Sequence, residues 1–273
     1  MSSPWLITGA TSGFGRLIAE RALAAGHHVI AVGRRPDQLA ELARLGRVTA
    51  VELDVTAPHA QEALTAAVTA AGGGLDVVVN NAGYGLFGSV EQIDAAQARA
   101  VFDTNVLANL TVLRATLPAL RAARGRIVQV SSLNGQFSWP ASGVYSASKS
   151  AVELISEGLA QELAPTGVKV TIVEPGLFAT GFTHNMHVVP SNDVYAQSVG
   201  KSLDHFASLP AQAFGDPRVV AEVVLAVVAL EDPPLRLAIG ADAVDNIRTS
   251  LRSRLAELDR WESFPLTVVG QDA

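Results

Sequence analysis

The chain has 273 residues, of which 49% are hydrophobic and 17% charged, so it can form a large core and is not disordered as a whole. Its formal net charge of −6 argues against nucleic acid as the main partner, and the absence of cysteine excludes disulfides and Cys-ligated metal sites. Its apolar runs are too short to span a bilayer and its N-terminus lacks a signal-peptide pattern, so we expect a cytoplasmic protein with no membrane partner.

The first 175 residues repeat a short β-branched run, a turn and an Ala/Leu-rich amphipathic stretch. This alternation predicts an α/β fold: a doubly wound parallel sheet of about seven strands with helices on both faces, in a single domain spanning residues 1–273. The predicted strands are Trp5–Thr8, His28–Val32, Val48–Leu53, Leu75–Asn80, Arg126–Ser131 and Val168–Val173. The predicted helices are Phe14–Ala25, Asp37–Leu45, Ala60–Ala71, Val90–Leu120 with a break near Thr104, and Gly143–Ala164.

The rhythm changes after Pro175. An irregular stretch runs to about Gly215, and a helix over Val219–Leu230, a strand over Leu235–Ile239 and a surface helix over Asp242–Glu262 follow. Long segments of this kind in a compact domain are usually functional. We therefore predict that residues 177–215 form a substrate-binding lid.

A glycine-rich turn from Thr8 to Gly15 follows the first predicted strand and opens the first predicted helix. Glycines suit this place because the turn is tight, the backbone must approach a pyrophosphate, and the N–H groups of the helix N-terminus bind the anion. The spacing differs from G-x-G-x-x-G, and a plain glycine-rich loop is the alternative. The residues predicted to bind phosphate here are Gly9, Thr11, Ser12, Gly13, Phe14 and Gly15.

The second predicted strand ends at Gly33-Arg34-Arg35, and the first carboxylate after it is Asp37. In nucleotide-binding domains of this type, an acidic residue here binds the ribose hydroxyls of NAD, whereas a basic residue accommodates the 2′-phosphate of NADP. A guanidinium pairs with phosphate oxygens in a bidentate manner. We therefore predict NADP(H) as the preferred cofactor, with Arg34 as the main phosphate partner and Arg35 beside it. The alternative is NAD(H) next to two solvated arginines.

Tyr145 and Lys149 lie four residues apart in a helical pattern, which puts the phenol and the ammonium on one face. A neighbouring cation stabilises a phenolate, so Lys149 is expected to lower the pKa of Tyr145 and to make it a general acid/base. Ser131 and Ser132 end the fifth predicted strand, at the edge where parallel sheets bind ligands. A hydroxyl there would hydrogen-bond the substrate oxygen. Taken alone, a Tyr-x-x-x-Lys spacing also fits an ordinary amphipathic helix.

In their order along the chain, these motifs resemble the short-chain dehydrogenase/reductase family. The resemblance covers nearly the whole chain and implies a Rossmann-type fold, a small-molecule carbonyl or alcohol substrate, and a homo-oligomer, either dimer or tetramer. The stretches Val173–Phe178 and Asn81–Gly85 are similar to the subgroup of hydroxysteroid and retinol dehydrogenases. The motifs that carry the resemblance are Thr8–Gly15, Asn80-Asn81-Ala82-Gly83, Ser132, Tyr145 with Lys149, and Pro175-Gly176.

The resemblance also implies roles for single residues. Asn105 matches the asparagine that holds a water in a proton relay to the active-site lysine. Ser132 would polarise the carbonyl, Tyr145 would protonate the developing alkoxide, and Lys149 would bind the nicotinamide ribose. The other cofactor contacts that it implies are adenine at Asp54 and Val55, the adenosine-side ribose and central sheet at Asn81, Ala82 and Gly83, and the nicotinamide carboxamide at Pro175, Gly176, Phe178 and Thr180.

The predicted lid is apolar and lacks a cluster of basic residues, which favours a hydrophobic ketone or secondary alcohol over a sugar or a phosphorylated metabolite. Aromatic side chains that merely close the lid onto the core are the alternative. Its apolar residues are Phe178, Phe182, Met186, Val188, Val189, Tyr195, Phe206 and Leu209. The predicted substrate contacts are Ser132, Trp139, Tyr145, Phe182 and Met186.

Two histidines in the lid, His184 and His187, lie close in sequence, but neither a third ligand nor a His-Glu-x-x-His motif accompanies them, so we predict no metal site. The sequence predicts an NADP(H)-dependent carbonyl reductase or alcohol dehydrogenase that transfers a hydride between the nicotinamide and a ketone or secondary alcohol. One alternative is an NAD-linked alcohol dehydrogenase working oxidatively. Another is a non-catalytic nucleotide-sensing protein that kept the fold, which the complete set of four catalytic residues disfavours.

Overall fold

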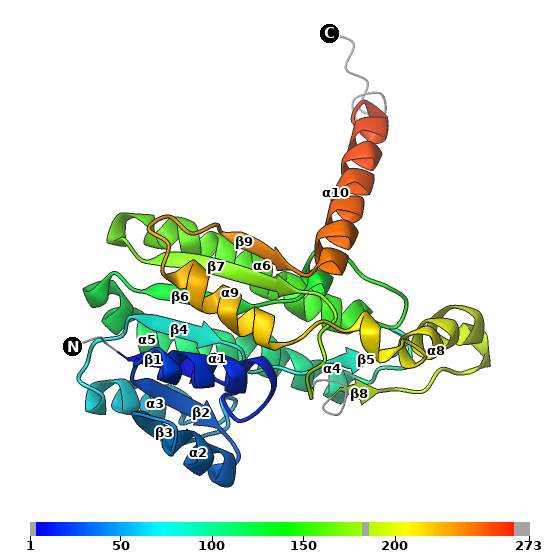
Figure 1. Cartoon of the computed structure of the whole chain (residues 1–273). Coiled ribbons are helices and arrows are strands. Elements are labelled where there is room, and N and C mark those ends of the chain that lie inside the picture. The colour runs from blue at the N-terminus through cyan, green and yellow to red at the C-terminus, as the bar shows by residue number, and fades with distance from the viewer. Residues whose placement is uncertain (1–3, 182–185, 265–273) are drawn as a thin grey trace.

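The computed structural model describes residues 4–181 and 186–264, and its centre is a seven-stranded parallel sheet with helices on both faces (Figure 1). The strand order is β3-β2-β1-β4-β6-β7-β9, so the chain winds from β1 to one edge and then from β4 to the other. This confirms the predicted doubly wound α/β fold. The strands are β1 (Trp5–Thr8), β2 (Val29–Gly33), β3 (Val48–Glu52), β4 (Val77–Asn80), β6 (Arg126–Val130), β7 (Lys169–Pro175) and β9 (Arg236–Ile239).

Successive side chains of each buried strand point to opposite faces of the sheet and enter two different cores. In β1, Leu6 packs with α3, α5 and α6, whereas Trp5 and Ile7 pack with α1, α2 and α9. Both faces are covered, which explains why the strands are almost continuously apolar. These helices are α1 (Gly13–Ala24), α2 (Pro36–Ala43), α3 (Ala60–Ala70), α5 (Ala108–Ala123), α6 (Gly143–Leu163) and α9 (Arg218–Val228).

The helix predicted over Val90–Leu120 begins too early and is not uniform. It consists of α4 (Ala95–Phe102), a π-helical turn at Asp103–Leu107, and α5. Asp94 and Gln97 form a capping box, each accepting a hydrogen bond from the backbone N–H of the other, and this fixes the start of α4. The break expected near Thr104 is the π-helical turn, which contains Asn105.

The segment predicted as irregular, 176 to about 215, contains regular structure. β8 (His187–Val188) pairs in parallel with β5 (Leu86–Phe87), and α8 (Lys201–Ala207) follows a second π-helical turn at Ala196–Gly200. Strands of two residues and a helix of about two turns are too short to produce a recognisable periodic pattern in the sequence. The segment is thus tied by backbone hydrogen bonds to the stretch that follows β4.

The last helix, α10 (Ala241–Trp261), projects away from the sheet (Figure 1). Only its base packs against the body, through Ala243 and Ile247, and every residue from 251 to 264 is exposed. Leu251, Leu255 and Leu258 follow one another at spacings of four and three, so they share one side of the helix. Over the described ranges, the helices are either too short or too polar to cross a bilayer.

Candidate active site

A cavity of about 980 Å³ lies at the carboxyl ends of the central strands, where doubly wound sheets bind ligands. Gly15 and Asn105 lie behind its lining, and Phe182 and His184 lie outside the described residues. The predicted cofactor and substrate residues that line it are Gly9, Thr11, Ser12, Gly13, Phe14, Arg34, Arg35, Asp54, Val55, Asn81, Ala82, Gly83, Ser132, Trp139, Tyr145, Lys149, Pro175, Gly176, Phe178, Thr180 and Met186.

The glycine turn is packed tightly on one side and open on the other. Asn81 Nδ2 donates to Thr8 O (2.9 Å), and a Cβ added at Gly9 would lie 2.8 Å from that nitrogen. A Cβ at Gly15 would lie 2.5 Å from Gly9 O, so Gly15 serves close packing. At Gly13, where α1 begins, the nearest atom to such a Cβ is 3.9 Å away, on Thr180. This leaves a space at a helix N-terminus, the geometry that suits a pyrophosphate.

Arg34 and Asp54 meet at the end of the cavity where the resemblance predicts adenine. Arg34 Nη1 lies 3.4 Å from Asp54 Oδ2, and the Arg34 side chain is 76% exposed. The hydroxyl and the backbone N–H of Thr56 both donate to Asp54 Oδ1, and with Arg34 nearby they lower the pKa of Asp54. The carboxylate is held in place while the guanidinium stays accessible to an anion.

Ser132 and Tyr145 are in contact at the centre of the site. Ser132 follows β6 and its Oγ accepts a hydrogen bond from Asn134 N (3.2 Å), while Tyr145, in the first turn of α6, is 5% exposed. Burial raises the pKa of Tyr145 to about 12, although its hydrogen bond with Ser132 acts in the opposite direction. The prediction that Lys149 lowers the tyrosine pKa is therefore wrong for the protein by itself, because burial dominates. A phenol in this state is a proton donor at neutral pH.

Lys149 lies one helical turn beyond Tyr145, with its Nζ 6.0 Å from the centre of the phenol ring. Nζ donates to Val130 O (2.9 Å), which ties α6 to the end of β6. Burial lowers the pKa of Lys149 to about 8, and the nearby Glu153 acts in the opposite direction. The ammonium is thus held at a fixed place, charged below about pH 8.

Asn105 does not line the cavity; its side chain binds the loop that follows β4. Its Oδ1 accepts from Tyr84 N (3.0 Å), and its Nδ2 donates to Tyr84 O and to Ser148 Oγ (both 3.0 Å). Both ends of the side-chain amide are thus engaged in holding that loop against α6. The amide therefore positions this loop.

The turn at Pro175 and Gly176 is held from the C-terminal end of the chain. Gly176 N donates to Ile239 O (2.9 Å), and Leu177 N donates to Asp242 Oδ2 (2.7 Å). A Cβ added at Gly176 would collide with the Asp242 carboxylate, which explains the glycine. The end of β9 and the start of α10 therefore shape the predicted nicotinamide anchor, a link that local sequence patterns do not reveal.

Apolar side chains line the cavity beside the Tyr145 ring. Phe87 lies between Tyr145 and Phe206, with ring centres 5.4 and 6.4 Å away. The sequence-based prediction missed Phe87, Leu203, Phe214 and Asn246, which also line the cavity; Asn246 comes from α10 and carried no local signal. The lid residues Val188, Val189 and Tyr195 do not line it: Val189 packs on Leu86, and Tyr195 donates to Glu91.

Among the described residues, no group of three or more His, Cys, Asp or Glu side chains is arranged so that it could hold a metal ion. His187 Nε2 lies 3.0 Å from Gln97 Nε2 and is thereby engaged with α4.

Comparisons with known proteins agree with this geometry. A sequence model of the short chain dehydrogenase family matches residues 5–188. Oxidoreductase BOA17 of Botryotinia fuckeliana is 36% identical over 97% of this chain and 99% of its own length. A 3-ketodihydrosphingosine reductase of Bacteroides thetaiotaomicron is 35% identical over 86% and 87%. A short-chain dehydrogenase structure from Streptomyces avermitilis has a TM-score of 0.90 and 41% identity, covering 98% of this chain and 100% of that one.

Two further solved structures contain a nicotinamide cofactor. A Burkholderia cenocepacia short chain dehydrogenase with NADP has a TM-score of 0.75 and 29% identity, covering 95% of this chain and 97% of that one. A Mycobacterium paratuberculosis short chain dehydrogenase with NAD has a TM-score of 0.74 and 26% identity, covering 88% and 97%. Together with the open glycine turn, they support a nicotinamide cofactor of either kind. The chain belongs to the short-chain dehydrogenase/reductase family and is an oxidoreductase that acts on CH–OH donors.

Proposed function

We propose that the protein is an NADP(H)-dependent carbonyl reductase or alcohol dehydrogenase for hydrophobic ketones or secondary alcohols. The observation that carries the proposal is the buried Ser132–Tyr145 hydrogen bond, which lies beside apolar side chains inside a cavity that also contains Arg34. When bound, the nicotinamide supplies the hydride. Ser132 donates a hydrogen bond to the substrate oxygen, Tyr145 gives that oxygen its proton, and Lys149 binds the nicotinamide ribose.

The lid prediction belongs to the same proposal. Residues 177–215 contribute Met186, Leu203, Phe206, Leu209 and Phe214 to the cavity, so this segment forms the substrate side of a single domain. One relative that resembles the chain over most of its length is named as a reductase of a ketone, which supports reduction. The subgroup similarity to hydroxysteroid and retinol dehydrogenases points the same way, to apolar substrates.

The test is the consumption of NADPH with a panel of ketones, followed by the reverse reaction with the corresponding alcohols. We expect turnover with apolar ketones and little with sugars or phosphorylated carbonyl compounds, because the substrate side offers aromatic rings rather than cations. The proposal is refuted if every member of the panel leaves NADPH unconsumed while the cofactor binds.

The preference for NADP(H) depends on Arg34. Replacing it by alanine (Arg34→Ala) should weaken NADPH binding by about tenfold to a hundredfold, because a charge-assisted hydrogen bond contributes about 1.5–3 kcal/mol. The affinity for NADH should stay the same, since NADH lacks the 2′-phosphate. Fluorescence titration of both cofactors measures this, and Arg44→Ala, on the exposed end of α2, is the matched control. Equal affinities of the unaltered protein for the two cofactors would rule out the preference.

The homo-oligomer also remains a prediction, and α10 offers a specific contact for it. Its exposed leucines, Leu251, Leu255 and Leu258, share one side of the helix, and no other described part of the chain covers them. In the part of α10 that carries these leucines, basic residues precede the midpoint and mainly acidic residues follow it. If a second copy packed against it in the antiparallel direction, the basic half of each helix would face the acidic half of the other. The charged residues are Arg248, Arg252 and Arg254 before, and Glu257, Asp259, Arg260 and Glu262 after.

Leu255→Glu is therefore expected to reduce the oligomer to a smaller species, because it puts a carboxylate at the centre of the paired face. Ser253→Glu adds the same charge on the opposite side of α10 and should leave the assembly intact. Sedimentation velocity distinguishes the two. If both variants sediment like the unaltered chain, α10 is not part of the interface.

A further inference from the structure

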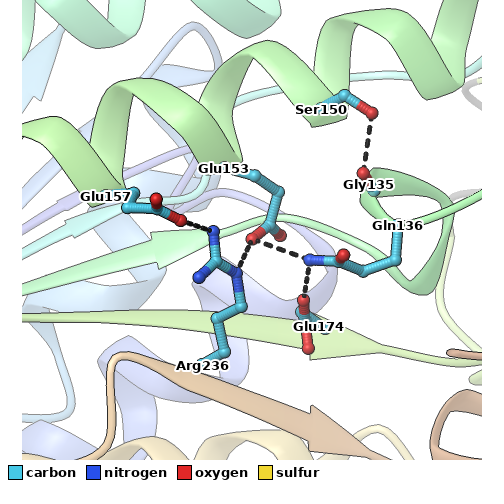
Figure 2. A network of polar contacts seen from close by, with 7 residues as sticks. All are labelled: Gly135, Gln136, Ser150, Glu153, Glu157, Glu174 and Arg236. Atoms are coloured by element: carbon cyan, nitrogen blue, oxygen red, sulfur yellow. Dashed lines mark hydrogen bonds and ion pairs between the residues drawn. The ribbon is translucent and has the colours of Figure 1, made fainter. Parts of the chain in front are cut away.

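Figure 2 shows a network of polar contacts that joins α6, β7, β9 and the stretch after β6. Arg236 Nε, from β9, donates to Glu153 Oε2 on α6 (3.0 Å). Gln136 Nε2 donates to Glu174 Oε1 on β7 (2.7 Å) and to Glu153 Oε2 (3.2 Å). Gln136 Nε2 thus bridges the two carboxyl groups, and Glu153 Oε1 is buried without a hydrogen-bond partner among the described residues. Four segments far apart in sequence therefore meet at two carboxyl groups.

The network has more carboxyl groups than cations. Glu153 and Glu174 are 2% and 3% exposed, and Arg236 is divided between Glu153 and the half-exposed Glu157, whose Oε2 lies 2.6 Å from Nη2. An ionised carboxylate only accepts hydrogen bonds, whereas a protonated carboxyl group also donates one, so a single proton would let the two neighbouring groups bind each other. Two ionised carboxylates side by side in this place would repel each other strongly.

Burial raises the pKa of both groups. For Glu174, burial and the neighbouring charge of Glu153 bring the pKa to about 7. For Glu153, burial also raises the pKa, while Ser131 and Arg236 act in the opposite direction. The proton therefore leaves the pair in the neutral range.

Three members of the network are close in sequence to a residue of the proposed mechanism. Glu153 is one helical turn beyond Lys149 on the same side of α6. Glu174 directly precedes the Pro175-Gly176 turn, and Gln136 follows Ser132 by four residues. The pair thus joins the strand that ends in the nicotinamide anchor to the helix that carries the ammonium.

We propose that Glu153 and Glu174 share one proton, and that in this state they are positioning residues that hold the Pro175-Gly176 turn at a fixed place relative to Lys149. Loss of the proton puts two like charges between β7 and α6, loosens the turn and weakens cofactor binding. This inference rests on the proposed function in one respect, namely that the Pro175-Gly176 turn is part of the cofactor site.

The groups around the pair come from four parts of the chain. On α6 they are Lys149 and Glu157; on β9, Arg236; after β6, Ser131 and Gln136; and on α10, Arg254, which donates to Gln136 O. Of these, Lys149 is the group that also titrates near neutrality, with its pKa lowered to about 8. A pH experiment must therefore separate the carboxyl pair from Lys149.

The variant Glu174→Gln achieves this separation, because an amide replaces the protonated acid with the same shape and leaves Lys149 in place. NADPH dissociation constants are measured by fluorescence between pH 5.5 and 9. We expect the unaltered protein to lose about tenfold more affinity than Glu174→Gln over this range, a coupling of ordinary size. The matched control is Glu162→Gln. Glu162 is an exposed carboxyl on α6, the helix that carries Glu153, so this variant should behave like the unaltered protein.

A readout without cofactor tests the shared proton directly. The infrared band of a protonated carboxyl group should be present at pH 5.5, disappear above neutral pH, and be absent in Glu174→Gln. The melting temperature should fall with rising pH more steeply in the unaltered protein than in this variant, since a raised pKa means stability that is lost as pH rises through it. If Glu174→Gln does not fold, Glu153→Gln removes the same proton from the other partner.

Equal pH dependence of binding and of melting in the unaltered protein and the variant would overturn the inference. Failure of NADPH to bind at any pH would refute the proposed function instead, while the infrared and melting experiments would still decide whether the pair shares a proton. A shared proton with pH-independent cofactor binding would overturn the positioning role.

Discussion

Tyr145→Phe should reduce turnover by about a thousandfold, within the range that a single general acid contributes. The expected loss is large because burial keeps this phenol protonated and in contact with Ser132, the side chain proposed to bind the same substrate oxygen. The dissociation constant of NADPH should change little, because the variant keeps the ring and the charge of Lys149. Steady-state kinetics and fluorescence titration measure the two quantities separately.

Tyr84→Phe is the matched control, since Tyr84 also lines the cavity but is held through its backbone by Asn105. It should keep most of the activity. The pH profile gives a second check: ketone reduction should decline above about pH 8, where Lys149 loses its charge, while the Tyr145 phenol, with its pKa raised to about 12, stays protonated. Near-normal turnover of Tyr145→Phe would refute its role as proton donor.

Arg236→Met should destabilise the protein by about 3 kcal/mol at pH 8, because it leaves Glu153 buried without its cation. The effect should be smaller at pH 5.5. The carboxyl pair has raised pKa values, so at low pH it takes up protons and carries less charge that needs the guanidinium. Urea unfolding at the two pH values measures the difference.

Arg218→Met is the matched control for this prediction. Arg218 also pairs with a carboxylate, Asp216, but its side chain is 76% exposed, so water replaces the lost contact and stability should hardly change. An Arg236→Met protein that is as stable at pH 8 as at pH 5.5 would show that the guanidinium does not neutralise the pair.

Local patterns in the sequence were enough to predict the sheet, the glycine turn and the Tyr145/Lys149 pair. Each of these depends on residues within one strand, one turn or one helix, and the family resemblance then placed Ser132 and the Pro175-Gly176 turn in the same site. The predicted elements differ from the observed strands of the main sheet by only a few residues at their ends.

Contacts between distant segments could not be predicted in the same way. Arg236 and Glu153 are 83 residues apart, and Asn246 reaches the cavity from the last helix. The effect of burial on Tyr145 was also missed, because the spacing of a tyrosine and a lysine shows their proximity but not the depth at which the phenol lies. The same limit explains why Asn105 was expected at the cavity rather than behind it.

The anchoring of Gly176 and Leu177 by Ile239 and Asp242 has a consequence for the newly made chain. Most residues that line the cavity are encoded before residue 182, yet the Pro175-Gly176 turn is not held until β9 and the first turn of α10 have been synthesised. A nascent chain folds in the order in which it leaves the ribosome. Firm cofactor binding should therefore begin only after residue 242 has emerged, so that the cofactor joins a nearly finished polypeptide rather than guiding its early folding.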